Sequence, residues 1–289
     1  MKRAVCLLLV FAFGIIFDFG HNYAFLIRYI LMIQLLFAFI NLSRFKIHEY
    51  KQHVYALIFM VMLSVVLFFP INLFNHNLAV VAFIIAISPT AIATTVIANL
   101  LDRDITYVAS FVVLSNLFVA FLLPLILPVL DHSDFNIANF MAILISTLSV
   151  IFIPFVLAFM LKFVLRDRVK KYVGKLKSIQ FYLWLLLMYL AISKASYFIK
   201  TNKNLYSEII GISILTAVIC CINYIVGRKL GSKKFRLESS IVLGQKNTAF
   251  MIWFSLTFLN PLVALGPTCY VLFQNIYNSY LLSRHRNLK

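Results

Sequence analysis

A lysine stands inside one of the most apolar stretches of this chain. Lys246 lies in the run of residues 239–254, which otherwise reads as a membrane-spanning helix. A lysine at the centre of such a helix costs on the order of 3 kcal/mol, so it is retained where a cavity, a partner or a ligand offsets that cost. Its neighbours Gly244, Gln245 and Asn247 are flexible or polar, which predicts a break in the helix and a functional site. The alternative is a lysine that snorkels to the nearer interface, which explains the lysine but not the adjacent amides.

Composition restricts the class of protein. Of the 289 residues, 63% are hydrophobic and 12% are charged, whereas a soluble globular domain carries about 25% charged residues. We therefore expect an integral membrane protein in contact with the lipid bilayer. The net charge of +17 would suggest nucleic acid for a soluble chain, but here it reflects topology and attraction to anionic lipid, so no nucleic-acid partner is expected. The four cysteines lie in apolar segments without metal-ligand spacing, and no metal or cofactor is expected.

Apolar stretches of roughly 17 to 25 residues recur along the chain without the period-two alternation of a barrel strand. This pattern predicts an all-α, polytopic membrane helical bundle of ten transmembrane helices. With a cytoplasmic N-terminus, Lys200 and Lys203 fall outside, Arg28, Lys194 and Lys246 fall within spans, and the other lysines and arginines fall on the cytoplasmic side. The positive-inside rule then predicts a multi-pass protein of the plasma membrane or bacterial inner membrane with both termini cytoplasmic. The spans are expected near residues 4–19, 23–42, 54–74, 78–101, 105–130, 137–161, 178–199, 206–227, 239–259 and 262–283.

Ten spans divide into two sets of five, residues 1–136 and 137–289. Because five is odd, the second set enters the membrane from the opposite side, as in an inverted repeat. The fourth span carries Pro89, and the ninth carries the polar residues around Lys246 at the same position in its set. A proline removes a backbone donor and clashes with the preceding turn, so helices four and nine are expected to be unwound and to cross within one membrane domain.

Other unusual positions in the spans have plainer explanations. Pro124 and Pro128 in the fifth span have no polar company in the sequence and are expected to be simple kinks. Ser64 and Ser115 are expected to be helix contacts or hydroxyls bonded to their own helix. Asn116 is a weaker candidate for lining a site. Arg28 and Lys194, which lie near the outer ends of their spans, are expected to snorkel.

The residues of the two breaks resemble those of the bile acid/sodium symporter family, and the chain is similar to a divergent member of it. The likeness covers nearly the whole chain and is clearest at residues 88–104, 244–247 and 267–279. It implies ten helices in two inverted repeats, with helices four and nine unwound and crossing at the site. The chain departs from the family at the sodium ligands, because Val242 stands in place of a glutamate and Lys246 in place of a glutamine.

Further family ligands are altered as well. Thr94 and Thr95 occupy the ligand positions of the fourth helix, and only Asn247 is kept in the ninth. The acidic residues all lie in connectors or at span ends, so no carboxylate is expected at the midplane. Sodium needs several hard oxygen ligands, and we therefore expect the Lys246 ammonium where the family would hold sodium.

Three function classes fit such a bundle: a transporter, an intramembrane enzyme and a sensor on a transporter fold. An enzyme would need a nucleophile, a metal site or a carboxylate pair inside the bundle, and the sequence offers none, so no catalytic residue is expected. A sensor would be favoured by an appended soluble domain, whereas the longest connector, residues 162–177, is a short basic loop. The sequence predicts a secondary active transporter of a small organic anion that works by alternating access and is sodium-independent or proton-coupled. The alternatives are a conventional sodium-coupled symporter and a non-transporting sensor.

Lys246 is expected to bind the carboxylate or sulfonate of the anion, or to serve as a built-in cation. Polar side chains near the two breaks would supply neutral hydrogen bonds to the substrate. These substrate-binding candidates are Ser88, Thr94, Thr95, Gln245, Asn247, Gln274 and Asn275, and the helix breaks are placed at Pro89 and Gly244.

Overall fold

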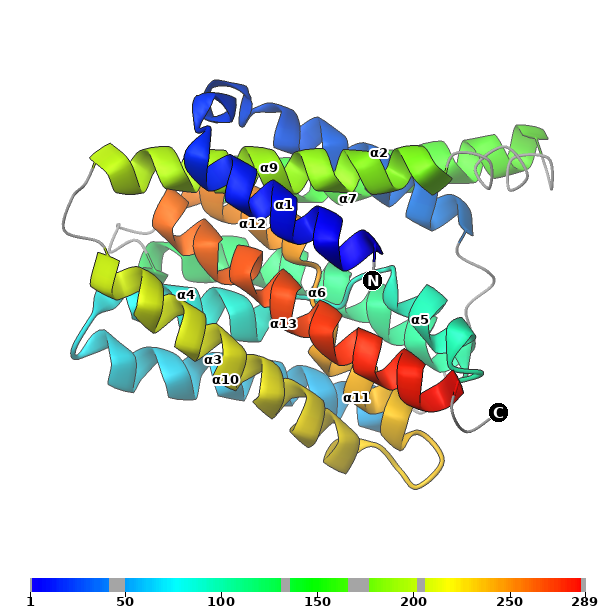
Figure 1. Cartoon of the computed structure of the whole chain (residues 1–289). Coiled ribbons are helices and arrows are strands. Elements are labelled where there is room, and N and C mark those ends of the chain that lie inside the picture. Colours follow the sequence, from blue (N-terminus) through cyan, green and yellow to red (C-terminus); the bar gives the residue numbers. More distant parts are fainter. Residues whose placement is uncertain (1, 42–49, 131–135, 166–176, 202–205, 287–289) are drawn as a thin grey trace. The chain divides into compact units, whose positions relative to one another are not determined.

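The computed structural model describes residues 2–41, 50–130, 136–165, 177–201 and 206–286. Within these ranges the chain is helical and contains no β-strand (Figure 1), so the expected all-α class holds for the described part of the chain. Residues 42–49, 131–135, 166–176 and 202–205, which include most of the expected basic connector 162–177, lie outside the described residues.

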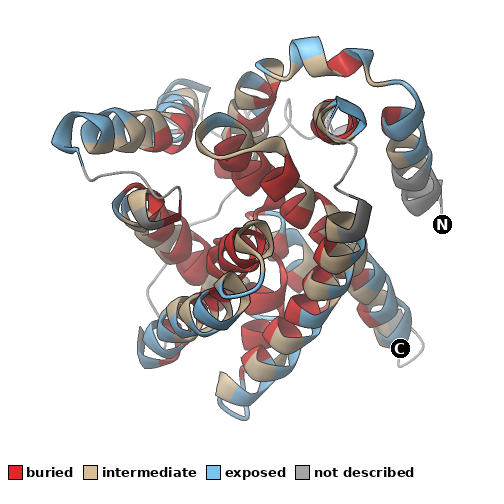
Figure 2. Cartoon of the chain, turned by 90° about the vertical axis from the view of Figure 1, so that its left-hand side faces the viewer, coloured by how far each residue is buried: buried red, intermediate tan, exposed pale blue. Residues whose placement is uncertain are grey.

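Several helices are suited to a membrane. Within the described ranges, five helices are long and apolar enough to cross one, judged by length and composition. Figure 2 shows helices that are buried along one side and exposed along the other, and the exposed side chains include many large hydrophobic residues. Apolar surface of that extent is typical of a protein embedded in lipid. The five helical segments are Lys51–Asn72, Ile105–Pro128, Ile137–Leu165, Ile179–Thr201 and Glu208–Leu230.

The chain forms two compact units, and each unit draws on both halves of the sequence. The units therefore do not coincide with the expected sets of five, residues 1–136 and 137–289. Compactness does not test repeat symmetry, so that division stays a prediction. Unit 1 comprises Met1–Ser43, Ala120–Lys203 and Ile252–Pro261, and unit 2 comprises Arg44–Val119, Asn204–Met251 and Leu262–Lys289.

Unit 1 contains two pairs of helices that run side by side in the same direction. In the pair α2 and α7, the Arg28 guanidinium donates to Ser149 Oγ at 2.9 Å, and Lys162 Nζ donates to the Phe39 carbonyl at 2.7 Å. The later residue of α2 contacts the later residue of α7, so the two helices are parallel. Arg28, which was expected to snorkel, thus has a partner inside the unit. The helices of unit 1 are α1 (Lys2–Ile16), the 3-10 helix η1 (Phe19–Tyr23), α2 (Leu26–Asn41), α7 (Ile137–Leu165) and α9 (Lys177–Thr201), with the second parts of α6 (Ile105–Leu130) and α12 (Thr248–Phe258).

The second parallel pair is α1 and α9. Gly14 faces Ile192, and one turn further along α9 the Ser196 hydroxyl donates to the Ile15 carbonyl at 3.0 Å. A Cβ on Gly14 would come within 2.9 Å of the Ile192 side chain. The glycine therefore permits the close approach of the two helices.

Unit 2 is built around α4 and α11. Residues 79–87 of α4 and residues 238–244 of α11 are all buried, which marks both helices as central, because a surface helix is buried along one stripe only. Helix α3 covers α4, and α10 covers α11. The helices of unit 2 are α3 (Tyr50–Asn72), α4 (His76–Ile87), α5 (Thr94–Leu100), α10 (Tyr206–Leu230), α11 (Arg236–Gly244) and α13 (Pro261–Arg286), with the first parts of α6 (Ile105–Leu130) and α12 (Thr248–Phe258).

Candidate functional site

Two buried helices of unit 2 stop inside the unit, and each is followed by a second helix (Figure 1). Residues 88–93, the first break, separate α4 from α5, and residues 245–247, the second break, separate α11 from α12. The first break has a local cause, because the residue before a proline avoids the helical region and Pro89 has no N–H. Ser88 is accordingly extended, with ψ at 131°.

The second break depends on a close approach between α10 and α11. A Cβ on Gly244 would lie 2.2 Å from the nearest atom of the Tyr224 ring, so only glycine fits there. The Tyr270 hydroxyl donates to the Gly244 carbonyl at 2.9 Å. The next residue, Gln245, then turns to an extended conformation with φ −90° and ψ 93°.

The two breaks meet in an isolated antiparallel β-bridge between Thr90 and Lys246. On each side of the bridge a backbone N–H of one break donates to a carbonyl of the other, at 2.7 and 2.9 Å. Backbone groups released by unwinding thus satisfy one another, as buried polar groups must. The flanking pairs are the Asn247 N–H with the Pro89 carbonyl and the Ala91 N–H with the Gln245 carbonyl.

At the first break, two side chains replace one helical hydrogen bond. In a continuous helix the Thr90 N–H would donate to the Ala86 carbonyl, four residues earlier. Instead, the Ala86 carbonyl accepts from Lys246 Nζ at 3.1 Å. The Thr90 N–H donates to Ser115 Oγ of α6, also at 3.1 Å.

The second break repeats this exchange with the roles reversed. The Val242 carbonyl, which the Lys246 N–H would fill in a continuous helix, accepts from Thr90 Oγ1 at 2.5 Å. The Lys246 N–H donates to Gln274 Oε1 of α13 at 3.0 Å. Thr90 therefore caps the carbonyl end of α11, and Lys246 caps the carbonyl end of α4. The acceptors for their own N–H groups come from α6 and α13.

Amide side chains complete the hydrogen bonding of the breaks. Asn116 of α6 donates to the Thr90 carbonyl at 2.8 Å, and its Oδ1 accepts from Asn247 Nδ2 at 3.1 Å. The other side-chain atom of Asn247, Oδ1, accepts from the Phe250 N–H at 3.3 Å in the first turn of α12. Gln245 forms a reciprocal amide pair with Asn278 of α13, in which each side chain donates to the other.

The electrostatics of the cluster centre on Lys246, which is 1% exposed. Its ammonium lies at the carbonyl end of α4, where the helix dipole favours a cation. Among the described residues Lys246 forms no ion pair with a carboxylate. A buried acid of this unit, Glu238, lies in the first turn of α11 and accepts from the Asp104 N–H at 3.3 Å.

The structure gathers four of the sequence candidates in one hydrogen-bonded cluster: Lys246, Gln245, Asn247 and Gln274. Pro89 and Gly244 lie at the two breaks. Three further candidates donate to a carbonyl three or four residues earlier in the chain and do not join the cluster, namely Ser88, Thr95 and Asn275. The Thr94 hydroxyl is buried and has no hydrogen-bond partner among the described residues.

Sequence reasoning missed the roles of Thr90, Ser115 and Asn278, and it ranked Asn116 too low. Ser115 was expected to bond its own helix, and it does donate to the Val112 carbonyl at 3.2 Å. Its second bond, to Thr90, is not visible in the sequence. The available signal was a polar pair inside each of two expected spans, Ser115 and Asn116 in the fifth and Gln274 and Asn275 in the tenth.

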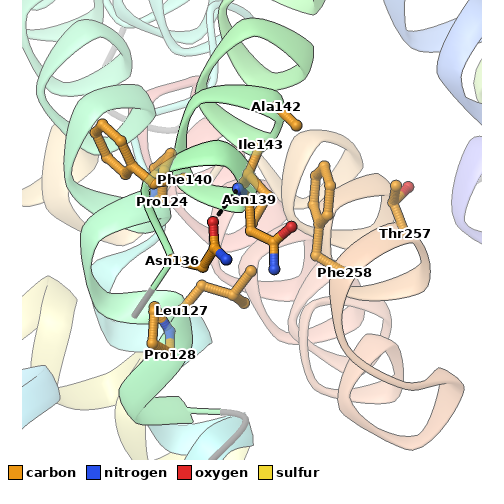
Figure 3. A pocket seen from close by; sticks show the side chains of 10 residues that line it. All are labelled: Pro124, Leu127, Pro128, Asn136, Asn139, Phe140, Ala142, Ile143, Thr257 and Phe258. Atoms are coloured by element: carbon orange, nitrogen blue, oxygen red, sulfur yellow. Dashed lines mark hydrogen bonds between the residues drawn. The ribbon is translucent and has the colours of Figure 1, made fainter. Parts of the chain in front are cut away.

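Unit 1 contains a cavity of about 360 Å³ among α6, α7 and α12 (Figure 3). Pro124 and Pro128 line it, together with the polar side chains of Asn136, Asn139 and Thr257. These polar side chains come from outside the span that holds the two prolines, so the sequence of that span does not show them, and the kinks at Pro124 and Pro128 stay a prediction. The described residues that line the cavity carry no charge.

Comparisons with known proteins leave the family open. No model of a known protein family matches the chain. No curated protein matches it either. The resemblance to the bile acid/sodium symporter family therefore rests on the residues themselves. Within the described ranges, no group of three or more histidine, cysteine, aspartate or glutamate side chains is placed to hold a metal ion.

Proposed function

We propose that this protein is a secondary active transporter of a small organic anion, with Lys246 as a built-in cation. The observation that carries the proposal is the position of the Lys246 ammonium, which is buried at the crossing of two helix breaks. In carriers with interrupted helices, the substrate site lies at such breaks, where helix ends direct partial charges toward it. The apolar helices are compatible with a membrane protein of this class.

The hydrogen bonds at the breaks support an inverted repeat. If each helix of the first set has a counterpart in the second, then Thr90 corresponds to Lys246, and Ser115 of α6 corresponds to Gln274 of α13. The N–H groups of Thr90 and Lys246 donate to side chains of α6 and α13, respectively. The side chain of each of these two residues donates to the last turn of the helix that precedes the other residue. A two-fold relation between the halves accounts for both sets of bonds at once.

Helix packing supports the same relation. The counterpart of the pair α1 and α9 is the pair α7 and α2, and both pairs are parallel. The pair α3 and α4 corresponds to α10 and α11, and the pair α4 and α10 corresponds to α11 and α3; all of these are in contact. We therefore propose ten spans, with α4 and α5 forming the fourth and α11 and α12 the ninth. Membership of the bile acid/sodium symporter family, location in the plasma membrane or bacterial inner membrane, and two cytoplasmic termini are parts of the same proposal.

The proposed coupling follows from the charge at the cluster. An ammonium occupies the carbonyl end of α4, where a coupling cation would otherwise be favoured. A second cation at the same oxygen would be repelled. Transport should thus be independent of sodium, and it is proton-coupled if the ammonium loses its proton during the cycle. Unit 2 would be the bundle that carries the crossed helices, and unit 1 the panel. The role proposed is that of a carrier, without a catalytic residue.

Uptake into proteoliposomes tests this function. The purified chain is reconstituted and offered a labelled short carboxylate, a 2-keto acid, a bile acid and an aryl sulfate, each in sodium, potassium or choline medium of equal ionic strength. We expect saturable uptake of at least one anion at the same rate in all three media. A steep sodium requirement would instead support the conventional symporter, and no uptake of any anion would favour the sensor.

Lys246→Gln tests the role of the lysine in the same assay. Loss of a charged hydrogen bond to the anion should weaken binding by about 10- to 100-fold. The matched control is Lys229→Gln, because Lys229 is an exposed lysine in the last turn of α10. Uptake by Lys246→Gln at the parental rate would show that the lysine is merely tolerated.

A further inference from the structure

The buried ammonium of Lys246 has fewer partners than it can bind. A lysine ammonium has three N–H donors, and among the described residues one acceptor is in place, the Ala86 carbonyl at 3.1 Å. Burying a charge with an incomplete set of partners is costly. An arriving anion would therefore meet an ammonium that is already held, but by a neutral oxygen.

The Ala86 oxygen has a second natural donor, which the fold keeps away. That donor is the Thr90 N–H, the partner of Ala86 in a continuous helix. Ser115 accepts this N–H instead, at 3.1 Å. Its oxygen can accept because its own O–H donates to the Val112 carbonyl. Ser115 thus reserves the Ala86 oxygen for the ammonium.

We infer that the Ala86 carbonyl is an internal substitute for the anion. In this structure it holds the Lys246 ammonium, and binding of a carboxylate or sulfonate would transfer the ammonium from this oxygen to the ligand. A charged oxygen is the stronger acceptor, so the exchange is favourable once a ligand is present. The ligand half of this inference rests on the proposed function, whereas the competition for the Ala86 oxygen concerns only the protein's own donors.

Ser115 is a positioning residue in this exchange, and its removal has a definite sign. In Ser115→Ala the buried Thr90 N–H loses its acceptor and needs another. Its acceptor in a continuous helix would be the Ala86 carbonyl. The Ala86 oxygen would then be shared by two donors and would turn toward the axis of α4. Both changes weaken its hydrogen bond with the Lys246 ammonium. The variant should therefore release the ammonium more readily, whereas a merely structural serine would have no such effect on a lysine of another helix.

Site-specific chemical modification measures this release without any substrate. The full chain in detergent micelles is treated with formaldehyde and borohydride, and the initial rate of methylation at Lys246 is read by peptide mass spectrometry relative to exposed Lys229. We expect slow modification of Lys246 in the parent and a rate at least about 3-fold higher in Ser115→Ala, the effect of weakening one charged hydrogen bond. The matched control is Ser64→Ala, because Ser64 is equally buried in unit 2 and its one hydrogen bond among the described residues goes to the Val61 carbonyl of its own helix.

Equal Lys246 rates in Ser115→Ala and Ser64→Ala would overturn the competition at Ala86. If circular dichroism shows that Ser115→Ala does not fold, Ser115→Cys replaces it with the same expectation, since a thiol is a weak acceptor. For any anion that the parent transports, Ser115→Ala should reach half-maximal uptake at a concentration about 3-fold lower, and an unchanged or higher value would refute the exchange. If the parent transports no anion, the proposed function fails, while the methylation rates still decide the competition.

Discussion

Replacing Thr90 by valine should destabilise the protein, although the two side chains have nearly the same size. Thr90 is 1% exposed, and its hydroxyl donates to the Val242 carbonyl at 2.5 Å. The usual helical partner of that carbonyl, the Lys246 N–H, is engaged by Gln274. The valine variant therefore leaves a buried carbonyl without a donor, which costs about 1–3 kcal/mol. Because the volume is conserved, the cavity contribution is small.

The free energy of unfolding, measured by titration with sodium dodecyl sulfate and followed by circular dichroism, checks this value. The matched control is Thr216→Val in α10, where the hydroxyl is also buried and donates to the Ile212 carbonyl at 2.6 Å. That carbonyl lies inside a continuous helix and keeps its backbone partner, so the control should be close to neutral. Thr90→Ser, which retains the hydroxyl, should lose less than Thr90→Val. Equal losses in Thr90→Val and Thr216→Val would refute the reciprocal capping of the two breaks.

Two further substitutions probe packing and surface charge. Gly244→Ala places a Cβ 2.2 Å from the Tyr224 ring and should cost about 1–3 kcal/mol of unfolding free energy through overpacking. Its control, Gly211→Ala, meets the flexible Leu78 side chain at 3.2 Å and should be neutral or stabilising, since alanine favours a helix; equal effects would contradict the close approach at Gly244. Lys200→Gln removes the ion pair with Asp18, in which the Lys200 side chain is 46% exposed and the Asp18 side chain 30% exposed. The substitution should change the free energy of unfolding by less than about 1 kcal/mol in the same titration. A larger loss would mean that this pair is not a surface pair.

Local features of the sequence were enough to predict the class and the places where the helices break. Long apolar stretches make helices whatever their partners, because backbone groups in lipid must be bonded within the segment. Pro89 interrupts the fourth expected span through its own ring and missing N–H, and the Gly244 to Asn247 stretch is polar and flexible by composition. Ten membrane spans, their repeat symmetry and the family remain predictions.

The partners at the breaks depended on tertiary structure, because each bond joins residues far apart in the chain. Thr90 and Val242 are 152 residues apart, and Lys246 and Ala86 are 160 apart. The rotation of α13 about its axis decides which of its polar side chains reach the breaks. Asn278 pairs with Gln245, whereas Asn275, about one turn earlier, donates to the carbonyl of Val271 in its own helix. A sequence shows which side chains can donate and accept, but only the packing of the helices decides which oxygen each donor meets.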